Sequence, residues 1–319
     1  MRRLVLTADR DIVFVFGAGA SYGAENVLPQ APPLGADLYD ALATEYPKQW
    51  GVESHLGKKW ANHFRTHFEL TMYEEVMPRV PSLDLLEWHR PMAEFFARYH
   101  LAGGQKDMYS VLVSALTTSG CLTRVTLGSL NYDCLLEQAI AGLGLAIDYT
   151  CDASTSRRFV PVAKIHGSCN FITDDLFSRR AYLTSAGSAI ECSFRPLPLE
   201  NLVDQLVEKF ATYNSAYYPV LGIYAQDKPS IVAGAKLQKL KNMLADRIRR
   251  ANVLAFIGVR PNPRDPHLWD PVAESRASTI AYVGGDAEFE ALRKLQKRAE
   301  HLARTFEDGA LAVVDVLPG

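Results

Sequence analysis

Short apolar segments separated by polar, helix-forming stretches recur along the chain and predict alternating strands and helices. The first, Ile12–Phe16, is a β-branched and aromatic run that ends at a glycine, as in a parallel strand buried on both faces. Similar runs follow at Arg124–Leu127, Pro161–Ile165, Val253–Ile257, Thr279–Val283 and Leu311–Val314. Strands that alternate with helices predict an α/β fold, a Rossmann-like parallel sheet with helices on both faces.

Apolar residues at helical spacing predict three of the connecting helices. These residues are Leu135, Leu136, Ala139, Ile140 and Leu143 in the first, Leu237, Leu240, Leu244 and Ile248 in the second, and Phe289, Leu292, Leu295, Ala299 and Leu302 in the third.

We expect a single domain over residues 1–319 with two interruptions. An aromatic-rich helical insertion is expected at about 57–100. An irregular, proline-containing segment at about 173–234 is either a lid or a partner-facing segment, and the sequence leaves both open.

Composition and charge describe an ordinary globular protein. Of 319 residues, 48% are hydrophobic and 22% charged, and the formal charge of −2 gives no reason to expect direct binding to nucleic acid. None of the five cysteines forms a Cys-x-x-Cys pair, so we expect neither a zinc ribbon nor a disulfide scaffold. Charges at Asp9, Arg10 and Asp11 interrupt the first apolar run, which argues against a signal peptide. We therefore expect a cytoplasmic protein without a membrane segment.

A glycine-containing segment follows the first predicted strand directly. Glycines allow the backbone to turn sharply and approach a phosphate, whereas the same residues also suit a plain tight turn. Tyr22 stands where the common dinucleotide fingerprint has its third glycine. In addition, no acidic residue ends a second strand about 20 positions later, as it would in an ordinary dehydrogenase. These two departures exclude that class of enzyme. The segment consists of Gly17, Ala18, Gly19, Ala20 and Ser21.

Polar residues also follow two other predicted strands. Ligands of open α/β sheets bind beyond the carboxyl ends of the strands, where Asn131 and Asp133 can direct an amide and a carboxylate at a ligand. The alternative is that one of these side chains caps the next helix. His166 ends the strand before Gly167 and Ser168, where it can act as a general base, although a lone histidine is also commonly structural.

Two further strands end at glycines. Gly258 and Val259 follow one strand and suit a second nucleotide contact, with Asp265 and His267 shortly after. Gly285 follows another strand, and the neighbouring Asp286 either reaches a ribose or caps a helix.

The order of these motifs resembles the sirtuin superfamily, most of all the bacterial sirtuin-like domains that hydrolyse NAD in antiphage defence. The motifs are Gly-Ala-Gly-Ala-Ser, Ser-x-Asn-x-Asp, Lys-Ile-His-Gly-Ser and Ile-Gly-Val, and they span residues 12 to about 286.

The resemblance implies a role for each motif. The segment from Gly17 to Ser21 would hold the pyrophosphate of NAD, Asn131 would lie by the nicotinamide ribose, and Asp133 would contact the carboxamide. His166 would be the base, with Gly167 and Ser168 beside it. On the adenosine side the contacts would come from Gly258, Val259 and Gly285. NAD is then the substrate, and no metal is expected.

The resemblance further implies an NAD glycohydrolase that releases nicotinamide and ADP-ribose, because the zinc ribbon of the deacylases is missing. Such an enzyme requires gating by homo-oligomerisation or by a partner such as an Argonaute-like protein or a HerA-type ATPase. A sensor that binds NAD or an ADP-ribose derivative without turnover, or an ADP-ribosyltransferase, remains an alternative. A zinc hydrolase built on His63 and His67 is disfavoured, because Phe64 replaces the required glutamate.

Overall fold

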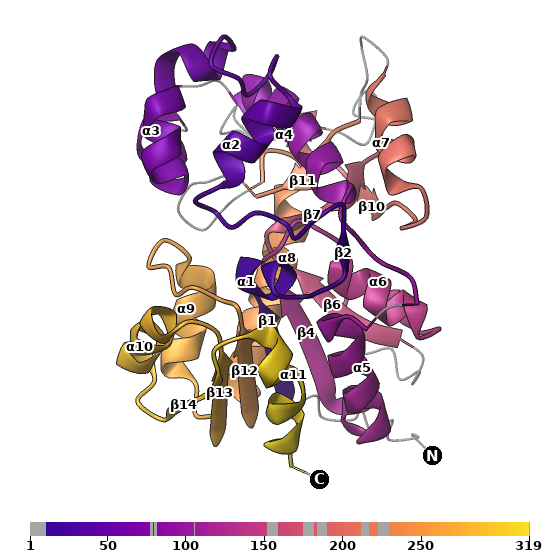
Figure 1. Cartoon of the computed structure of the whole chain (residues 1–319), viewed down its shortest axis with the longest axis vertical. Coiled ribbons are helices and arrows are strands. Elements are labelled where there is room, and N and C mark those ends of the chain that lie inside the picture. The colour runs from indigo at the N-terminus through magenta and orange to yellow at the C-terminus, as the bar shows by residue number, and fades with distance from the viewer. Residues whose placement is uncertain are drawn as a thin grey trace.

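Seven parallel strands form the central sheet of the protein (Figure 1), in the order β14-β13-β12-β1-β4-β6-β5. The computed structural model describes residues 11–76, 79, 82–104, 106–151, 159–174, 182–183, 190–211, 217–222 and 230–318. The strands are β1 (Ile12–Phe16), β4 (Val125–Ser129), β5 (Ala146–Asp148), β6 (Phe159–Lys164), β12 (Val253–Ile257), β13 (Thr279–Val283) and β14 (Ala299–Ala303). With helices on both faces of this sheet, the predicted Rossmann-like fold is confirmed.

The central strand β1 shows why the sheet is covered twice. Ile12, Phe14 and Phe16 belong to one hydrophobic core, whereas Val13 and Val15, which point to the opposite face, belong to another. On the first face lie α5 (Met108–Thr118), α6 (Leu135–Gly142) and α11 (Phe306–Asp315). On the second face lie α8 (Gly234–Arg250), α9 (Pro266–Glu274) and α10 (Asp286–Leu295).

A second group of elements lies above the sheet in Figure 1 and shares the first core. It combines a three-stranded antiparallel sheet, in the order β10-β7-β11, with four helices and a π-helical turn at Met72–Val76. Its members are α2 (Leu38–Glu45), α3 (His55–Thr71), α4 (Ser82–Ala97), β7 (Gly167–Thr173), β10 (Phe194–Pro196), α7 (Leu202–Phe210) and β11 (Pro219–Leu221). The stretch at about 57–100 thus contains α3 and α4, and the described part of 173–234 includes β10, α7 and β11.

The remaining elements are short. They are α1 (Ala18–Tyr22), β2 (Val27–Leu28), β3 (His100–Leu101), a 3₁₀ turn at Cys121–Arg124, β8 (Tyr182–Leu183) and β9 (Ile190–Glu191). Within the described residues, no helix has the length and apolar character that crossing a bilayer demands.

Near the C-terminus the predicted order of strand and helix was wrong. Leu311–Val314 was predicted as a strand but lies in α11, because the Thr305 side chain accepts a hydrogen bond from the Asp308 amide (3.2 Å) and starts a helix there. Conversely, Ala299 and Leu302 were assigned to the preceding helix, which ends at Leu295. Residues Ala299–Ala303 instead pair with β13 as the edge strand β14.

Candidate functional site

The register of the central sheet brings the four sequence motifs to one edge. Phe16 of β1 is level with Ile257 of β12 and with Ser129 of β4, and Ser129 is level with Lys164 of β6. Each motif therefore leaves the sheet at the same height, one residue later, at Gly17, Leu130, Ile165 and Gly258. This is the carboxyl edge of the parallel strands, where open α/β sheets bind ligands.

The glycine segment after β1 packs directly against the glycine after β12. The Gly19 amide donates to the Gly258 carbonyl at 3.0 Å. A β-carbon on Gly17 would lie 2.5 Å from that same oxygen, and one on Gly258 would lie 2.1 Å from the Ala20 nitrogen. Gly258 also has a φ of +60°, which disfavours any other residue. These glycines thus permit direct contact between the start of α1 and the turn after β12, as expected if both contribute to one site.

Asn131 is fixed to the glycine segment by its side-chain amide. Its Nδ2 donates to the Gly17 carbonyl and to Ser21 Oγ, both at 2.9 Å, and the residue is only 8% exposed. The Ser21 hydroxyl in turn lies 3.0 Å from the Tyr109 hydroxyl. Because both amide hydrogens are used, Asn131 can offer a ligand its carbonyl oxygen, an acceptor for a hydroxyl or a water.

Asp133 lies at the start of α6, and one of its oxygens accepts a hydrogen bond from the Leu135 amide at 3.1 Å. The contact spans two residues, as in an Asx turn just before α6, and is not an N-cap bond, because the N-cap residue of α6 is Cys134 and its side chain makes no capping hydrogen bond. The Asp133 carbonyl also accepts a hydrogen bond from the buried Lys164 ammonium. The loop that carries Asn131 is thereby tied to the end of β6.

Lys164 and Glu137 form a buried ion pair beneath this edge of the sheet. Their charged groups lie 3.1 Å apart, and their side chains are 1% and 0% exposed. Burial opposes the charged form of Lys164, but the Glu137 carboxylate raises the pKa of the ammonium above its usual value, so that Lys164 stays protonated. The pair joins α6 to β6, the elements that follow Asn131 and precede His166.

His166 follows β6 and is held through its backbone. Its carbonyl accepts from the Gly222 amide at 2.8 Å, while the Tyr132 hydroxyl donates to the Gly222 carbonyl at 2.9 Å. Gly167 then turns the chain with a φ of +81°, and a β-carbon there would lie 2.0 Å from the Val220 oxygen. His166 and Tyr132, the residue next to Asn131, are thus both hydrogen-bonded to Gly222.

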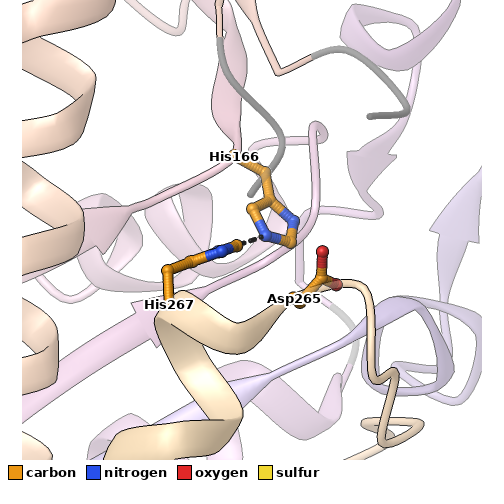
Figure 2. Close-up of side chains that lie close together, drawn as sticks. All are labelled: His166, Asp265 and His267. Carbon is orange, nitrogen blue, oxygen red and sulfur yellow. Dashed lines mark hydrogen bonds between the residues drawn. The ribbon is translucent and has the colours of Figure 1, made fainter. Parts of the chain in front are cut away.

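The His166 ring, 2% exposed, contacts a second histidine that the sequence placed near the site without giving it a role. His166 Nε2 and His267 Nε2 are 3.2 Å apart, and one ligand atom of Asp265 lies within 4.8 Å of one on each ring. Figure 2 shows the Asp265 carboxylate beside the His166 ring. His267 is 101 positions away in the chain, so no short spacing in the sequence reveals this contact.

The other predicted residues have different surroundings. Ser168 is buried with its hydroxyl 3.6 Å from the sulfur of Cys134, and the Val259 carbonyl accepts a hydrogen bond from the Tyr282 hydroxyl at 2.9 Å. Gly285 precedes α10 at the end of β13, two strands away from β1. Ala18 is the first residue of α1.

The histidine pair of α3 does not form a regular helical motif. His63 and His67 are exposed, and His67 has non-helical backbone angles (φ −151°, ψ 70°). These angles remove the i, i+4 geometry that a zinc-binding helix requires.

Comparison with known proteins gives a distant structural likeness. No protein-family model and no curated protein sequence matches the chain. Among solved structures, a Sir2 enzyme from a study of Sir2 mechanism and regulation is 13% identical over 98% of this chain and 96% of its own, with a TM-score of 0.47. A Sir2 homologue–NAD complex is 14% identical over 95% and 88%, also at 0.47. A mutant Sir2 homologue bound to ADP-ribose is 13% identical over 99% and 96%, at 0.48.

Proposed function

We propose that the protein is an NAD glycohydrolase, which cleaves the nicotinamide–ribose bond to give nicotinamide and ADP-ribose. The observation that carries the proposal is the convergence of the Gly17–Ser21 segment, Asn131, His166 and Gly258 at one edge of the sheet. The sequence resemblance assigns these motifs to NAD, and the sheet register gives them a common location.

Each group has a defined task in this reaction. Departure of neutral nicotinamide from NAD leaves an oxocarbenium-like centre on the ribose. Water then forms a bond to that carbon and gives its proton to His166, while the Asn131 carbonyl oxygen orients the water. The Gly17–Ser21 segment and Gly258 hold the pyrophosphate and adenosine side. Asp133 is proposed to contact the carboxamide with the oxygen that does not bond the Leu135 amide.

The proposed cellular role is an NAD-depleting effector in bacterial antiphage defence, a role taken from the family resemblance. Uncontrolled NAD loss would damage the cell that makes the enzyme. We therefore propose that a second copy or a separate partner, such as an Argonaute-like protein or a HerA-type ATPase, switches the activity on.

The test is NAD loss and nicotinamide release, measured by chromatography with the purified chain over a range of protein concentrations and with candidate partners. Replacing a general base typically slows a reaction by about 10²–10⁴-fold, so His166→Ala should lose activity to that extent. Asn131→Ala should lose about 10²–10³-fold. His63→Ala removes an exposed histidine on α3 and should match the wild type. NAD binding without turnover in every condition would instead favour the sensor alternative.

A further inference from the structure

Three side chains with metal-binding atoms meet at one point, and one of them is the proposed base His166. His166 comes from the end of β6, whereas Asp265 and His267 come from the start of α9. One ligand atom from each lies within 4.8 Å of the other two, and both His166 and Asp265 are buried. Figure 2 shows the His267 ring and the Asp265 carboxylate both directed at the His166 ring.

The distance between the two rings suits a shared ion. His166 Nε2 and His267 Nε2 are 3.2 Å apart. Zinc binds imidazole nitrogen at about 2.0–2.1 Å in tetrahedral geometry, which separates two such ligands by about 3.3 Å. The Asp265 oxygen, at most 4.8 Å from the other ligand atoms, needs to approach by about 1.5 Å, which rotation of its side chain can supply.

The position of Asp265 supports a role other than helix capping. It is the N-cap residue of α9, where aspartate is favoured because its carboxylate accepts hydrogen bonds from the first amides. In this helix, however, the Asp265 side chain makes no capping hydrogen bond. Its carboxylate lies by the two histidines instead.

Solvent reaches the cluster from its His267 side. His267 is partly exposed and lines a groove between α8 and α9. The groove also contains Gln238, Asn242, Asp246, Arg249 and Asp270. An ion in this groove can therefore reach His267.

We propose that His166, Asp265 and His267 bind a divalent transition-metal ion such as Zn²⁺, and that the bound ion inhibits NAD hydrolysis. Two imidazoles and one carboxylate select such ions over Mg²⁺ or Ca²⁺, which prefer oxygen ligands. Three protein ligands leave a fourth position for water. The inhibitory part rests on the proposed function: an ion on His166 Nε2 occupies the lone pair that a base needs to accept a proton.

Binding is tested without NAD, using the purified full chain treated with a chelator and titrated with Co²⁺. Wild type should bind one Co²⁺ with the visible absorption of a tetrahedral ion. His267→Ala and Asp265→Asn each remove one metal ligand. Each should weaken Co²⁺ binding by at least about 10–100-fold, which is the loss that follows from removing only a supporting contact of a ligand. His63→Ala is the control and should bind as wild type does. Absence of Co²⁺ binding by wild type, or equal binding by His267→Ala, would overturn the metal site.

Inhibition is tested by NAD hydrolysis at increasing Zn²⁺. The concentration that halves activity should rise at least 10-fold in Asp265→Asn relative to wild type and His63→Ala, as expected for a weakened site. Activation by Zn²⁺, or inhibition unchanged in Asp265→Asn, would overturn the inhibitory role. If Co²⁺ binds as expected but no condition yields NAD hydrolysis, the metal site stands and the proposed function fails.

Discussion

Replacement of Lys164 by methionine is the strongest test of how the site is supported, because it leaves Glu137 buried without its cation. Glu137 is 0% exposed, and its carboxylate lies 3.1 Å from the Lys164 ammonium. Removing one member of a buried pair typically costs about 3–5 kcal/mol. Glu137 can limit the penalty by taking up a proton. For a carboxyl with the ordinary glutamate pKa of 4.5, protonation at pH 7 costs about 3.4 kcal/mol.

The expected loss of unfolding free energy for Lys164→Met is therefore about 3 kcal/mol at pH 7. Burial already raises the pKa of Glu137, and without Lys164 it rises further. A carboxyl whose folded pKa is raised destabilises the protein as pH rises above the unfolded value. The penalty should hence be smaller at pH 5.5 than at pH 7, by at most about 2 kcal/mol for one proton.

Urea denaturation followed by circular dichroism measures the effect at both pH values. Lys239→Met, which replaces an exposed lysine on α8, is the matched control and should stay within about 0.5 kcal/mol of wild type. Adding Glu137→Leu to Lys164→Met should recover most of the loss, since apolar residues often replace a buried ion pair without cost. A penalty under 1 kcal/mol, an equal penalty at both pH values, or no recovery in the double variant would refute this reasoning.

Three other predictions concern stability and the contact between loops. Gly258→Ala places a β-carbon 2.1 Å from the Ala20 nitrogen, so the free energy of unfolding in urea should fall by about 2–4 kcal/mol and NAD binding in calorimetry should weaken. Unchanged values of both quantities would contradict the contact between the two segments. Burial lowers the pKa of His89 to about 4, so stability should fall by about 2 kcal/mol from pH 6.5 to pH 5, and thermal unfolding of His89→Leu should lack that slope. The Arg124 guanidinium holds the pKa of Asp11 below its usual value, which stabilises the fold above about pH 4 and is lost as pH falls further. Asp11→Asn should cost about 1–2 kcal/mol at pH 7 in urea denaturation, and a cost that persists at pH 2.5 would contradict the assignment.

The sequence predicted the middle of the sheet better than its edge. Val253–Ile257 and Thr279–Val283 are strands at the predicted residues, because strands covered on both faces are apolar along their whole length. The edge strand Ala299–Ala303 is mostly half-buried, and its sequence does not show that pattern. The apolar run Leu311–Val314 is helical because its position after the Thr305 cap decides its structure.

The sequence located the motifs of the site but not all of their contacts. Parallel strands share a carboxyl edge, so residues that follow them, such as Asn131 and His166, leave the sheet on the same side. Contact between His166 and His267 depends on how α9 packs against the sheet, which periodicity does not specify. The turn that Asp133 makes before α6 depends on the local backbone, which its position after a strand does not specify.

The contact of Gly17 and Gly19 with Gly258 also has a consequence during synthesis. The first half of this contact leaves the ribosome early, whereas Gly258 follows about 240 residues later, so a growing chain lacks one wall of the proposed site. Pairing across so many residues is slow, because the closure of a long loop must precede the contacts that stabilise it. If the protein consumes NAD as proposed, we expect incomplete chains to be inactive, and a cell that degrades them would not be exposed to their activity.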